Sequence, residues 1–474
     1  MLKKTKIVAT ISDLHCNVKL IRSLYSAGLN VVRLNTAHMN REGALKIVSN
    51  IRKVSDQIAL LIDTKGPEIR TTEASEQIHV SYGDKIEIKG NKSGITSRKC
   101  VYVNYNNFVR DVPVGSRILI DDGYIELIVK RVKENSLICE VLNNGVIEGR
   151  KSVNIPSVHV KLPALTEKDI DFIHFAIEND LDFIAHSFVR NKKDVHAVQK
   201  ILDKHNSSIQ IIAKIENQQG VDNIDEILDH VYGVMVARGD LAVEVPQEKI
   251  PGIQKMLIEK CIARRKPVII ATQMLHSMIH NPRPTRAEIS DVANAIYDGT
   301  DAIMLSGETA FGNYPVESVE TMSQIALEAE SIKPPIKKTP MLVINNEISA
   351  FFAITAVNAS LELETKAIVA DTQEGRSIRA LAAYRGKNLI IAQCYSRKSM
   401  RELALSYGVY SYFMKRSGNR DVFVREGIKI LEKEFKLSTS DRIVVLAGNY
   451  GNGKGLSFMQ IGTIAELKNM NYCD

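Results

Sequence analysis

Eight short apolar segments rich in β-branched residues recur along the chain, and each is followed by a stretch of helical character. Strands that alternate with helices in this way are typical of a parallel sheet built from βαβ units. Eight units predict a (β/α)8 TIM barrel, an α/β fold whose active site lies at the carboxyl ends of the strands. The segments span residues 6–10, 31–35, 59–63, 183–188, 211–215, 233–237, 268–272 and 302–306.

Two regions depart from this pattern. Between residues 67 and 162 apolar and polar residues alternate and glycine and aspartate punctuate the runs, as in antiparallel strands joined by turns. Beyond the lysine- and proline-rich stretch 331–340 another series of strands and helices begins. We therefore expect the barrel in two pieces, residues 1–66 and 163–338, with a small β domain inserted at 67–162 and a separate C-terminal α/β domain at 339–474.

Composition limits the partners. The net charge of +7 is spread along the chain, so it favours attraction of small anions over nucleic-acid binding. The six cysteines form no C-x-x-C pair, which favours reduced thiols. No segment has the apolar length of a secretory signal or of a membrane span. We expect a cytoplasmic protein without nucleic-acid or membrane partners.

Charged or hydroxyl side chains follow six of the eight predicted strands. Lys214 and Glu216 are two residues apart, so they share one face of their strand. A surface ion pair is the simpler interpretation of one such pair, but so many polar strand ends at one mouth favour a functional site. The others are Arg33, Asn35, Asp63, Thr64, Arg238, Asp240, Thr272, Ser306 and Glu308.

The mixture of groups narrows the chemistry. Glu216 and Asp240 are suitable oxygen ligands for Mg²⁺, which takes few protein ligands. Arg33, Arg70 and Lys214 supply positive charge that matches a phosphoryl group. These groups predict an anionic, phosphorylated substrate. The alternative is that the same residues form a purely structural ion-pair network.

Six motifs closely resemble those of pyruvate kinases, in the same order and with the inserted domain in the same place, over nearly the whole chain. The resemblance implies transfer of the phosphoryl group of phosphoenolpyruvate (PEP) to ADP in glycolysis, with Mg²⁺ (or Mn²⁺) and K⁺ as cofactors, by a homotetramer. The motifs are VVRLNTAH (31–38), LIDTKGPEIRT (61–71), KIENQQG (214–220), GVMVARGDLAVEVP (233–246), ATQMLHSM (271–278) and NPRPTRAEISDVANAIYDGTDAIMLSGET (281–309).

The resemblance also implies that the insertion at 67–162 is an inserted small β-barrel lid domain and that 339–474 is a C-terminal α/β domain of regulatory type. It further implies a role for each matched residue. Lys214 would stabilise the phosphoryl group in flight, Arg33 would hold the phosphate, and Thr272 would belong to the proton-delivery side. Glu216 and Asp240 would bind the divalent metal. Backbone amides at Ala237, Arg238 and Gly239 would receive the substrate carboxylate. The implied nucleotide-binding residues are Asn35, His38, Arg70 and Lys151, and the implied K⁺ ligands are Asn35, Asp63 and Thr64.

Departures from the family pattern affect the nucleotide and K⁺ sites. TISDLHC (10–16) replaces the usual T-I-G-P-A-S, NTAHM (35–39) has Ala37 where a serine is usual, and RKSVNIPS (150–157) lacks two hinge glycines. An active kinase is the main hypothesis. A Mg²⁺-dependent pyruvate lyase and a non-catalytic homologue are the alternatives.

Two stretches of the C-terminal region bear on regulation. GNYGNGK (448–454) satisfies G-x-x-x-x-G-K, but Gly455 stands where a P-loop needs serine or threonine, so a plain glycine loop or an effector cradle is expected. DTQEGRSIR (371–379) resembles the turn that binds fructose 1,6-bisphosphate in some family members. Glu374 would place a carboxylate against that phosphate, so no activation by the bisphosphate is expected.

Overall fold

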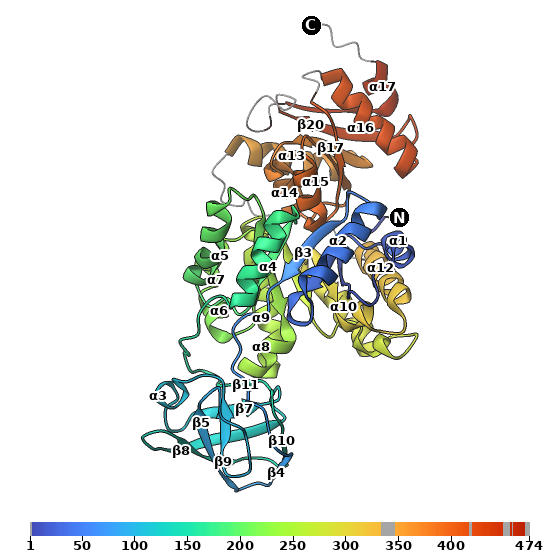
Figure 1. Ribbon diagram of the computed structural model, residues 1–474. Helices are drawn as coiled ribbons and strands as arrows, with labels where there is room; N and C mark the ends of the chain where they lie inside the picture. Colours follow the sequence, from blue (N-terminus) through green and yellow to red (C-terminus); the bar gives the residue numbers. More distant parts are fainter. Residues whose placement is uncertain (1, 333–346, 417–419, 449–455, 457, 470–474) are drawn as a thin grey trace.

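The structure is a computed structural model that describes residues 2–332, 347–416, 420–448, 456 and 458–469. Three parts follow one another along the long axis of the molecule (Figure 1). A barrel lies in the middle, a small β part that comprises β4–β11 lies at one end, and an α/β part that comprises α13–α17 and β17–β21 lies at the other. The predicted boundary at residue 338/339 lies outside the described residues.

Eight parallel strands close into a ring in the order β1-β16-β15-β14-β13-β12-β3-β2, which confirms the predicted TIM barrel. Three strands end one or two residues earlier than predicted. The strands are β1 (Lys6–Thr10), β2 (Val31–Asn35), β3 (Ala59–Asp63), β12 (Phe183–His186), β13 (Gln210–Ile215), β14 (Gly233–Ala237), β15 (Val268–Ala271) and β16 (Ala302–Leu305).

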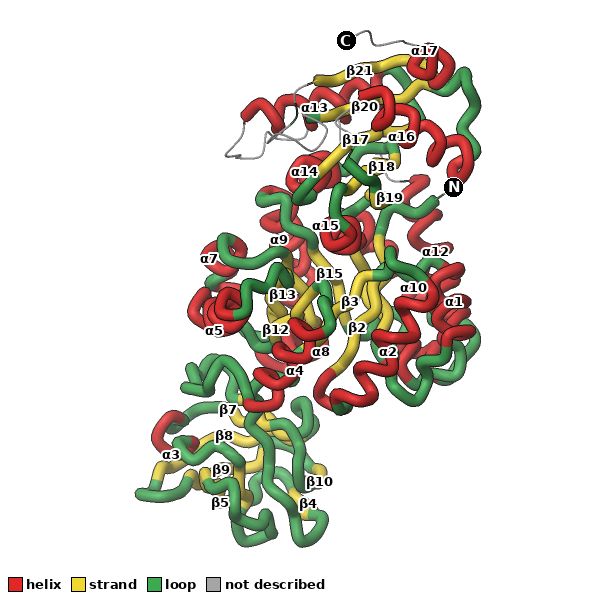
Figure 2. The backbone as a smooth tube through the Cα atoms, turned by 45° about the horizontal axis from the view of Figure 1, so that its top comes forward, coloured by secondary structure: helices red, strands yellow, loops and turns green. Residues whose placement is uncertain are grey.

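Helices surround the ring (Figure 2). The α-helices are α1 (Val18–Ala27), α2 (Arg41–Val54), α4 (Glu167–Glu178), α5 (Lys192–Lys204), α6 (Gln218–Asp222), α7 (Ile224–Leu228), α8 (Arg238–Glu244), α9 (Ile250–Ala263), α10 (Arg286–Asp298), α11 (Gly307–Ala310) and α12 (Pro315–Ile332). Short 3-10 helices are η1 (Thr36–His38), η2 (Gln247–Lys249) and η3 (His276–Ile279).

Alternation along the strands divides the apolar residues between two clusters. One set, which includes Val8, Phe183 and Met235, fills the barrel interior, and the other packs against the helices. Leu405, from the α/β part, belongs to the interior cluster. The amino end of the barrel is therefore closed by a side chain from outside it.

The sequence also specifies where helices begin. Thr166 and Asp169 form a capping box at the start of α4, and Thr285 with Glu288 forms another at α10. Each box satisfies backbone donors that the first helical turn leaves free. Helix α1 ends at Gly28, whose φ of 117° is in the left-handed region.

The inserted β part has its own apolar core and two hydrogen-bonded sheets. Residues Arg70 and Thr71 form isolated bridges with Ser152, beside one edge of the larger sheet, and with Val103 at its other edge, so this segment closes a small barrel. All pairings between its named strands are antiparallel except that of β5 with β6, which the long connection 91–100 joins. The elements are β4 (Ile78–Val80), β5 (Lys85–Gly90), β6 (Val101–Val103), α3 (Phe108–Asp111), β7 (Arg117–Ile120), β8 (Ile125–Val132), β9 (Leu137–Val141), β10 (Gly145–Ile147) and β11 (Val153–Asn154).

The α/β part is a five-stranded sheet in the order β19-β18-β17-β20-β21, with helices on both faces. Strand β21 pairs antiparallel with β20, and the sequence analysis did not predict it. The elements are α13 (Glu347–Glu362), β17 (Ala367–Thr372), α14 (Arg376–Ala383), β18 (Leu389–Cys394), α15 (Arg397–Glu402), η4 (Leu403–Leu405), β19 (Val409–Phe413), α16 (Arg420–Phe435), β20 (Arg442–Ala447), β21 (Phe458–Thr463) and α17 (Ile464–Asn469).

Buried ion pairs fasten the α/β part to the amino end of the barrel. Arg385 donates two hydrogen bonds to Asp301, which precedes β16, at 3.0 and 2.7 Å. Arg401 donates to Asp182, which precedes β12, at 2.6 Å. The α/β part thus sits opposite the carboxyl-end mouth of the barrel.

Within the described residues, no helix is both long and apolar enough to cross a membrane. The five cysteines in this part of the chain are free and buried.

Candidate active site

Most of the predicted site residues lie at the mouth of the barrel from which the inserted β part extends (Figure 1), while Arg70 and Lys151 lie in the inserted part and its connections. Carboxyl ends of parallel strands open at one end of a barrel, so side chains from several strands meet there. Arg33 and Asn35 end β2, Asp63 ends β3, Lys214 lies in β13, Glu216 follows it, Asp240 lies in α8, and Thr272 follows β15.

Asp63 holds two cations, one on each carboxylate oxygen. Oδ2 accepts a hydrogen bond from Arg33 Nε at 2.6 Å, and Oδ1 lies 3.0 Å from Lys214 Nζ. Burial alone would raise the pKa of Asp63, but the charges of Arg33 and Lys214 hold that pKa below its usual value. The ionised carboxylate therefore fixes the positions of both cations.

Lys214 has an acceptor for each hydrogen of its ammonium group. Besides Asp63, Nζ lies 2.9 Å from Glu216 Oε1 and 2.9 Å from Ser187 Oγ. Burial alone would lower the pKa of Lys214, but the charges of Asp63, Glu216 and Asp240 raise it above its usual value. Lys214 is thus a permanently charged and firmly oriented group.

Glu216, which is buried, and Asp240, which is exposed at the mouth, bring two carboxyl groups together. Burial raises the pKa of Glu216 to about 7 against the opposing effect of Lys214, and partial desolvation of the Asp240 carboxyl group also raises its pKa. The two carboxyl groups are close enough to interact through a hydrogen bond. The backbone N–H of Phe188 donates to Glu216 Oε2 at 2.7 Å.

This pair of carboxyl groups fits a divalent cation. Two negative charges side by side repel each other, and Mg²⁺ binds to a small number of carboxylate oxygens. In the described part of the chain, no group of three or more His, Cys, Asp or Glu side chains could hold a metal ion. A metal at this site would rest on Glu216 and Asp240, with water and substrate oxygens completing its shell.

Thr272 lies one residue beyond β15, so the predicted strand 268–272 was one residue too long. Its φ of +70° is in the left-handed region, which cannot continue a strand. Its hydroxyl donates to the carbonyl of Ala271 at 2.6 Å and accepts from the backbone N–H of Gly239 at 2.8 Å. The hydroxyl is therefore fixed beside the start of α8.

The side chain of Arg238 is bound within the barrel wall. Its guanidinium donates to Asp291 at 2.7 Å and to the carbonyl of Thr272 at 2.8 Å. Of the backbone amides at Ala237, Arg238 and Gly239 that were predicted to receive the substrate carboxylate, the amide of Gly239 already donates to the Thr272 hydroxyl.

The structure does not bring Arg70 and Lys151 to Lys214. Arg70 Nε donates to Glu68 at 2.7 Å, while Lys151 Nζ lies 3.0 Å from Asp121 and 3.2 Å from Glu148. Both cations are thus paired with acidic groups of the connecting and inserted segments. They would have to exchange these partners to bind a nucleotide.

Of the other two predicted nucleotide residues, His38 is exposed on η1 at the mouth. Asn35 caps η1, because its side-chain oxygen accepts from the backbone N–H of Ala37 at 3.2 Å.

The predicted K⁺ ligands are adjacent but already engaged. The carbonyl of Thr64 accepts from Ser187 Oγ at 2.6 Å, and the Asp63 carboxylate binds Arg33 and Lys214. Lys168 Nζ donates to the carbonyl of Ala37 at 3.1 Å, so a fixed positive charge stands beside the position where the family serine is missing.

Sequence reasoning missed Ser187 and Thr10. Ser187 contacts Lys214, and Thr10 Oγ1 accepts from Arg33 Nη1 at 2.9 Å. Ser187 directly follows β12, a strand to which the sequence analysis assigned no polar end. Its position after a barrel strand was the signal that could have identified it. Thr10 is the last residue of β1, but a threonine is too common in strands to mark a site.

The fold and the mouth together define a class, TIM-barrel enzymes that act on anionic substrates beneath an inserted domain. A family model described as the barrel domain of pyruvate kinase matches residues 2–319, and one described as its alpha/beta domain matches residues 351–461. The chain belongs to the pyruvate kinase family, and it is an enzyme.

Individual relatives agree. A pyruvate kinase of Borreliella burgdorferi is 46% identical over 469 residues, covering 98% of each chain. One of Staphylococcus epidermidis is 43% identical over 468 residues, covering 97% of this chain and 80% of the relative. The crystal structure of a Cryptosporidium parvum pyruvate kinase superposes with a TM-score of 0.91 at 34% identity, covering 98% of this chain and 96% of that one.

Proposed function

We propose that the chain transfers the phosphoryl group of PEP to ADP, giving pyruvate and ATP in glycolysis, at the mouth described above. The observation that carries the proposal is Lys214, a buried ammonium group held by Asp63, Glu216 and Ser187. Such a group is arranged before the substrate arrives, so it stabilises charge that develops on a transferring phosphoryl group without reorganisation.

In this reaction an oxygen of the ADP β-phosphate attacks phosphorus, and the bond from phosphorus to the enol oxygen of PEP breaks. Lys214 stabilises the phosphoryl group in flight, and Arg33 binds its oxygens from the other side of Asp63. The enolate then takes a proton at its methylene carbon, on the side where the hydroxyl of Thr272 is fixed. Backbone amides from Ala237 to Gly239 receive the substrate carboxylate.

Glu216 and Asp240 would hold Mg²⁺ or Mn²⁺. When bound, the metal offsets negative charge on the carboxylate and enolate oxygens of the substrate. Asn35, Asp63 and Thr64 would supply oxygens to K⁺.

The inserted β part serves as a lid over the nucleotide. Closure would let Arg70 and Lys151 exchange their acidic partners for ADP phosphates, while Asn35 and His38 contact the nucleotide from the barrel. Closure also excludes water, which favours transfer to ADP over hydrolysis.

Buried free thiols support a cytoplasmic location, and resemblance to the family supports a homotetramer. Multi-angle light scattering on the purified chain tests the latter.

The test is a coupled assay of pyruvate formed from PEP with ADP, GDP, CDP and UDP, on the wild type and on Lys214→Met. The expected kcat of the variant is lower by about a thousandfold or more with PEP binding little changed, because the charge acts mainly in the transition state. A variant within tenfold of wild type would refute the role of Lys214. Pyruvate formed from PEP without any nucleotide would be hydrolysis and would refute phosphoryl transfer to ADP. No turnover of PEP by the wild type would support the pyruvate lyase or the non-catalytic homologue.

A further inference from the structure

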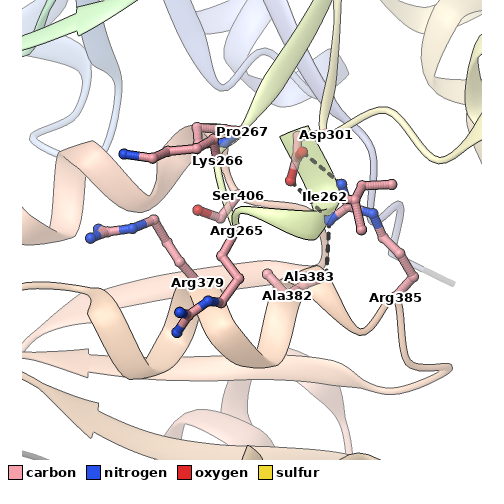
Figure 3. A pocket seen from close by; sticks show the side chains of 10 residues that line it. All are labelled: Ile262, Arg265, Lys266, Pro267, Asp301, Arg379, Ala382, Ala383, Arg385 and Ser406. Atoms are coloured by element: carbon pink, nitrogen blue, oxygen red, sulfur yellow. Dashed lines mark hydrogen bonds and ion pairs between the residues drawn. The ribbon is translucent and has the colours of Figure 1, made fainter. Parts of the chain in front are cut away.

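A pocket lies between the amino end of the barrel and the α/β part, on the opposite side of the barrel from the mouth (Figure 3). Its empty volume of about 220 Å³ includes open solvent. The barrel contributes the turn between α9 and β15, and the α/β part contributes α14 and the residue after η4. Three cationic side chains, Arg265, Lys266 and Arg379, line it and project to the same side in Figure 3.

Two of these cations lack a carboxylate partner within the described chain. Lys266 Nζ donates to the carbonyl of Val231 at 2.6 Å. Arg379 donates to the carbonyl of Glu374 at 3.2 Å, and its guanidinium lies over the ring of Tyr232, 4.9 Å from the centroid. Neutral acceptors leave the positive charge of both groups uncompensated.

The fourth cation of the pocket is different. Arg385 is bound to both oxygens of Asp301 at 3.0 and 2.7 Å, so this pair is close to neutral and contributes to the wall. Its bonds are drawn on the far side of the pocket from the three cations in Figure 3.

The three cations repel one another. Burial lowers the pKa of Lys266, and the charge of Arg379 lowers it further. Burial and the charge of Arg379 also lower the pKa of Arg265. Asp229 acts on Lys266 and Glu402 acts on Arg379, but neither forms an ion pair with these cations in the described residues. The positive charge of Lys266 and Arg379 therefore exceeds what the described part of the chain balances.

Ser406 provides an independent observation. Its side chain lines the pocket and is buried, yet Oγ has no hydrogen-bond partner within the described residues. In Figure 3 the hydroxyl points to the same side as the cations. A buried hydroxyl without a partner is costly, so a missing acceptor is expected there.

We propose that this pocket binds a phosphorylated small molecule through its phosphoryl group. The planar guanidinium group of Arg379 can donate two parallel hydrogen bonds to phosphoryl oxygens. Lys266 supplies a compact positive charge, and Ser406 donates a hydrogen bond. The ligand would touch the barrel through Lys266 and the α/β part through Arg379 and Ser406, so it would join the two parts. The site is separate from the mouth and lies on the barrel side of α14, although Arg379 also contacts the 371–379 stretch through the carbonyl of Glu374.

The experiment measures phosphate-dependent stabilisation by calorimetry in a chloride buffer of constant ionic strength. The probes are inorganic phosphate and glucose 6-phosphate, which distinguish a free anion from a phosphate monoester. The variants are Arg379→Gln and the milder Ser406→Ala. Arg376→Gln is the matched control, since Arg376 lies on the same helix but is exposed and paired with Glu374 at 2.8 Å.

We expect Tm of the wild type and of Arg376→Gln to rise with at least one probe. Arg379→Gln should weaken the apparent affinity by about tenfold, as expected for loss of a charged hydrogen bond, and Ser406→Ala should weaken it less. Equal stabilisation of all four proteins would place the phosphate at the mouth and overturn the proposal, as would no stabilisation of the wild type. If Arg379→Gln does not fold, Ser406→Ala decides alone.

Discussion

Gly66 lies so close to Ser187 that a Cβ atom on the glycine would stand 2.8 Å from the Cβ of the serine. The φ of Gly66 is +72°, a conformation in which a side chain is strained. Because Ser187 Oγ accepts from Lys214, a residue in the lid connection controls the position of a group at the centre of the mouth.

We predict that Gly66→Ala lowers both stability and kcat. Backbone strain and the clash together should cost about 2 kcal/mol or more, and the displaced Ser187 should no longer orient Lys214. The control is Gly83→Ala, since Gly83 has a φ of +87° with nothing within 4 Å of the added atom. It should lose about 1 kcal/mol by strain alone and keep its kcat. Unchanged kcat in both variants would contradict the role given to Ser187.

Asp169 fastens both connections of the lid, and we predict that Asp169→Asn loosens them. Oδ1 accepts from the backbone N–H groups of Lys65 and Gly66 at 2.8 and 3.3 Å, and Oδ2 accepts from the backbone N–H and the hydroxyl of Thr166 at 2.9 and 2.7 Å. An amide NH₂ cannot accept, so one set of bonds is lost and KM for ADP should rise several-fold.

The matched control is Glu288→Gln, which disturbs the capping box of α10 far from the lid. Both variants should lose about 1 kcal/mol of stability. Steady-state kinetics then separates them, because only the Asp169 variant should change KM for ADP. The same KM in both would show that Asp169 is merely a cap.

His186 is fully buried with no hydrogen-bond partner for either ring nitrogen within the described residues. Burial lowers the pKa of its imidazole to about 4, with Asp194 and Asp169 raising it and Lys214 and Arg190 lowering it. The unfolded chain, with a pKa of about 6.5, binds the proton more readily between these values, so stability falls as the pH decreases from about 6.5 to 4.

We predict that His186→Ala flattens this part of the stability curve. The wild type should lose up to about 3 kcal/mol from this group across the interval. The variant should be less stable at neutral pH, because of the cavity, but should lose less on acidification. Calorimetry from pH 7 to 4 measures the difference. Parallel curves for the two proteins would show that His186 does not titrate on unfolding.

We predict a requirement for K⁺ with a raised half-saturation. In the family a glutamate at the position of Glu68 accompanies this requirement, while Ala37 removes one hydroxyl ligand that water can replace. Ala37→Ser should lower the K⁺ half-saturation in a tetramethylammonium buffer. Full activity of the wild type without K⁺ would defeat the prediction and would point to Lys168, which contacts the Ala37 carbonyl, as the substitute charge.

We predict no activation by fructose 1,6-bisphosphate. Glu374 stands in the 371–377 turn and forms an ion pair with Arg376 at 2.8 Å, so its charge is partly balanced but still present. Like charges at contact distance oppose binding. Saturation curves for PEP with and without the bisphosphate should superimpose. A shift of the curve to lower PEP concentration on adding the bisphosphate would contradict the prediction. The glycine loop 449–455 lies outside the described residues.

The barrel was predictable because each strand carries its own apolar pattern and six of the eight are followed by charged or hydroxyl side chains. Strand β21 was not, since residues 458–463 show neither a continuous apolar run nor strict alternation, and the pairing with β20 defines it. At the mouth, sequence placed Lys214 and Glu216 on one face. It could not show that Asp63 bridges Arg33 and Lys214, because that relationship depends on side chains from three strands meeting in space.

The two segments that lead into and out of the lid run side by side. The backbone N–H of Thr71 donates to the carbonyl of Lys151 at 2.9 Å, and the backbone N–H of Val153 donates to the carbonyl of Ile69 at 2.8 Å. For a folding barrel, the distance along the chain between β3 and β12 is therefore shortened as soon as the lid has formed, and the entropy of closing that gap falls to that of a short loop. Residues of the lid between these paired ends can therefore be exchanged or added without changing the register of the eight barrel strands.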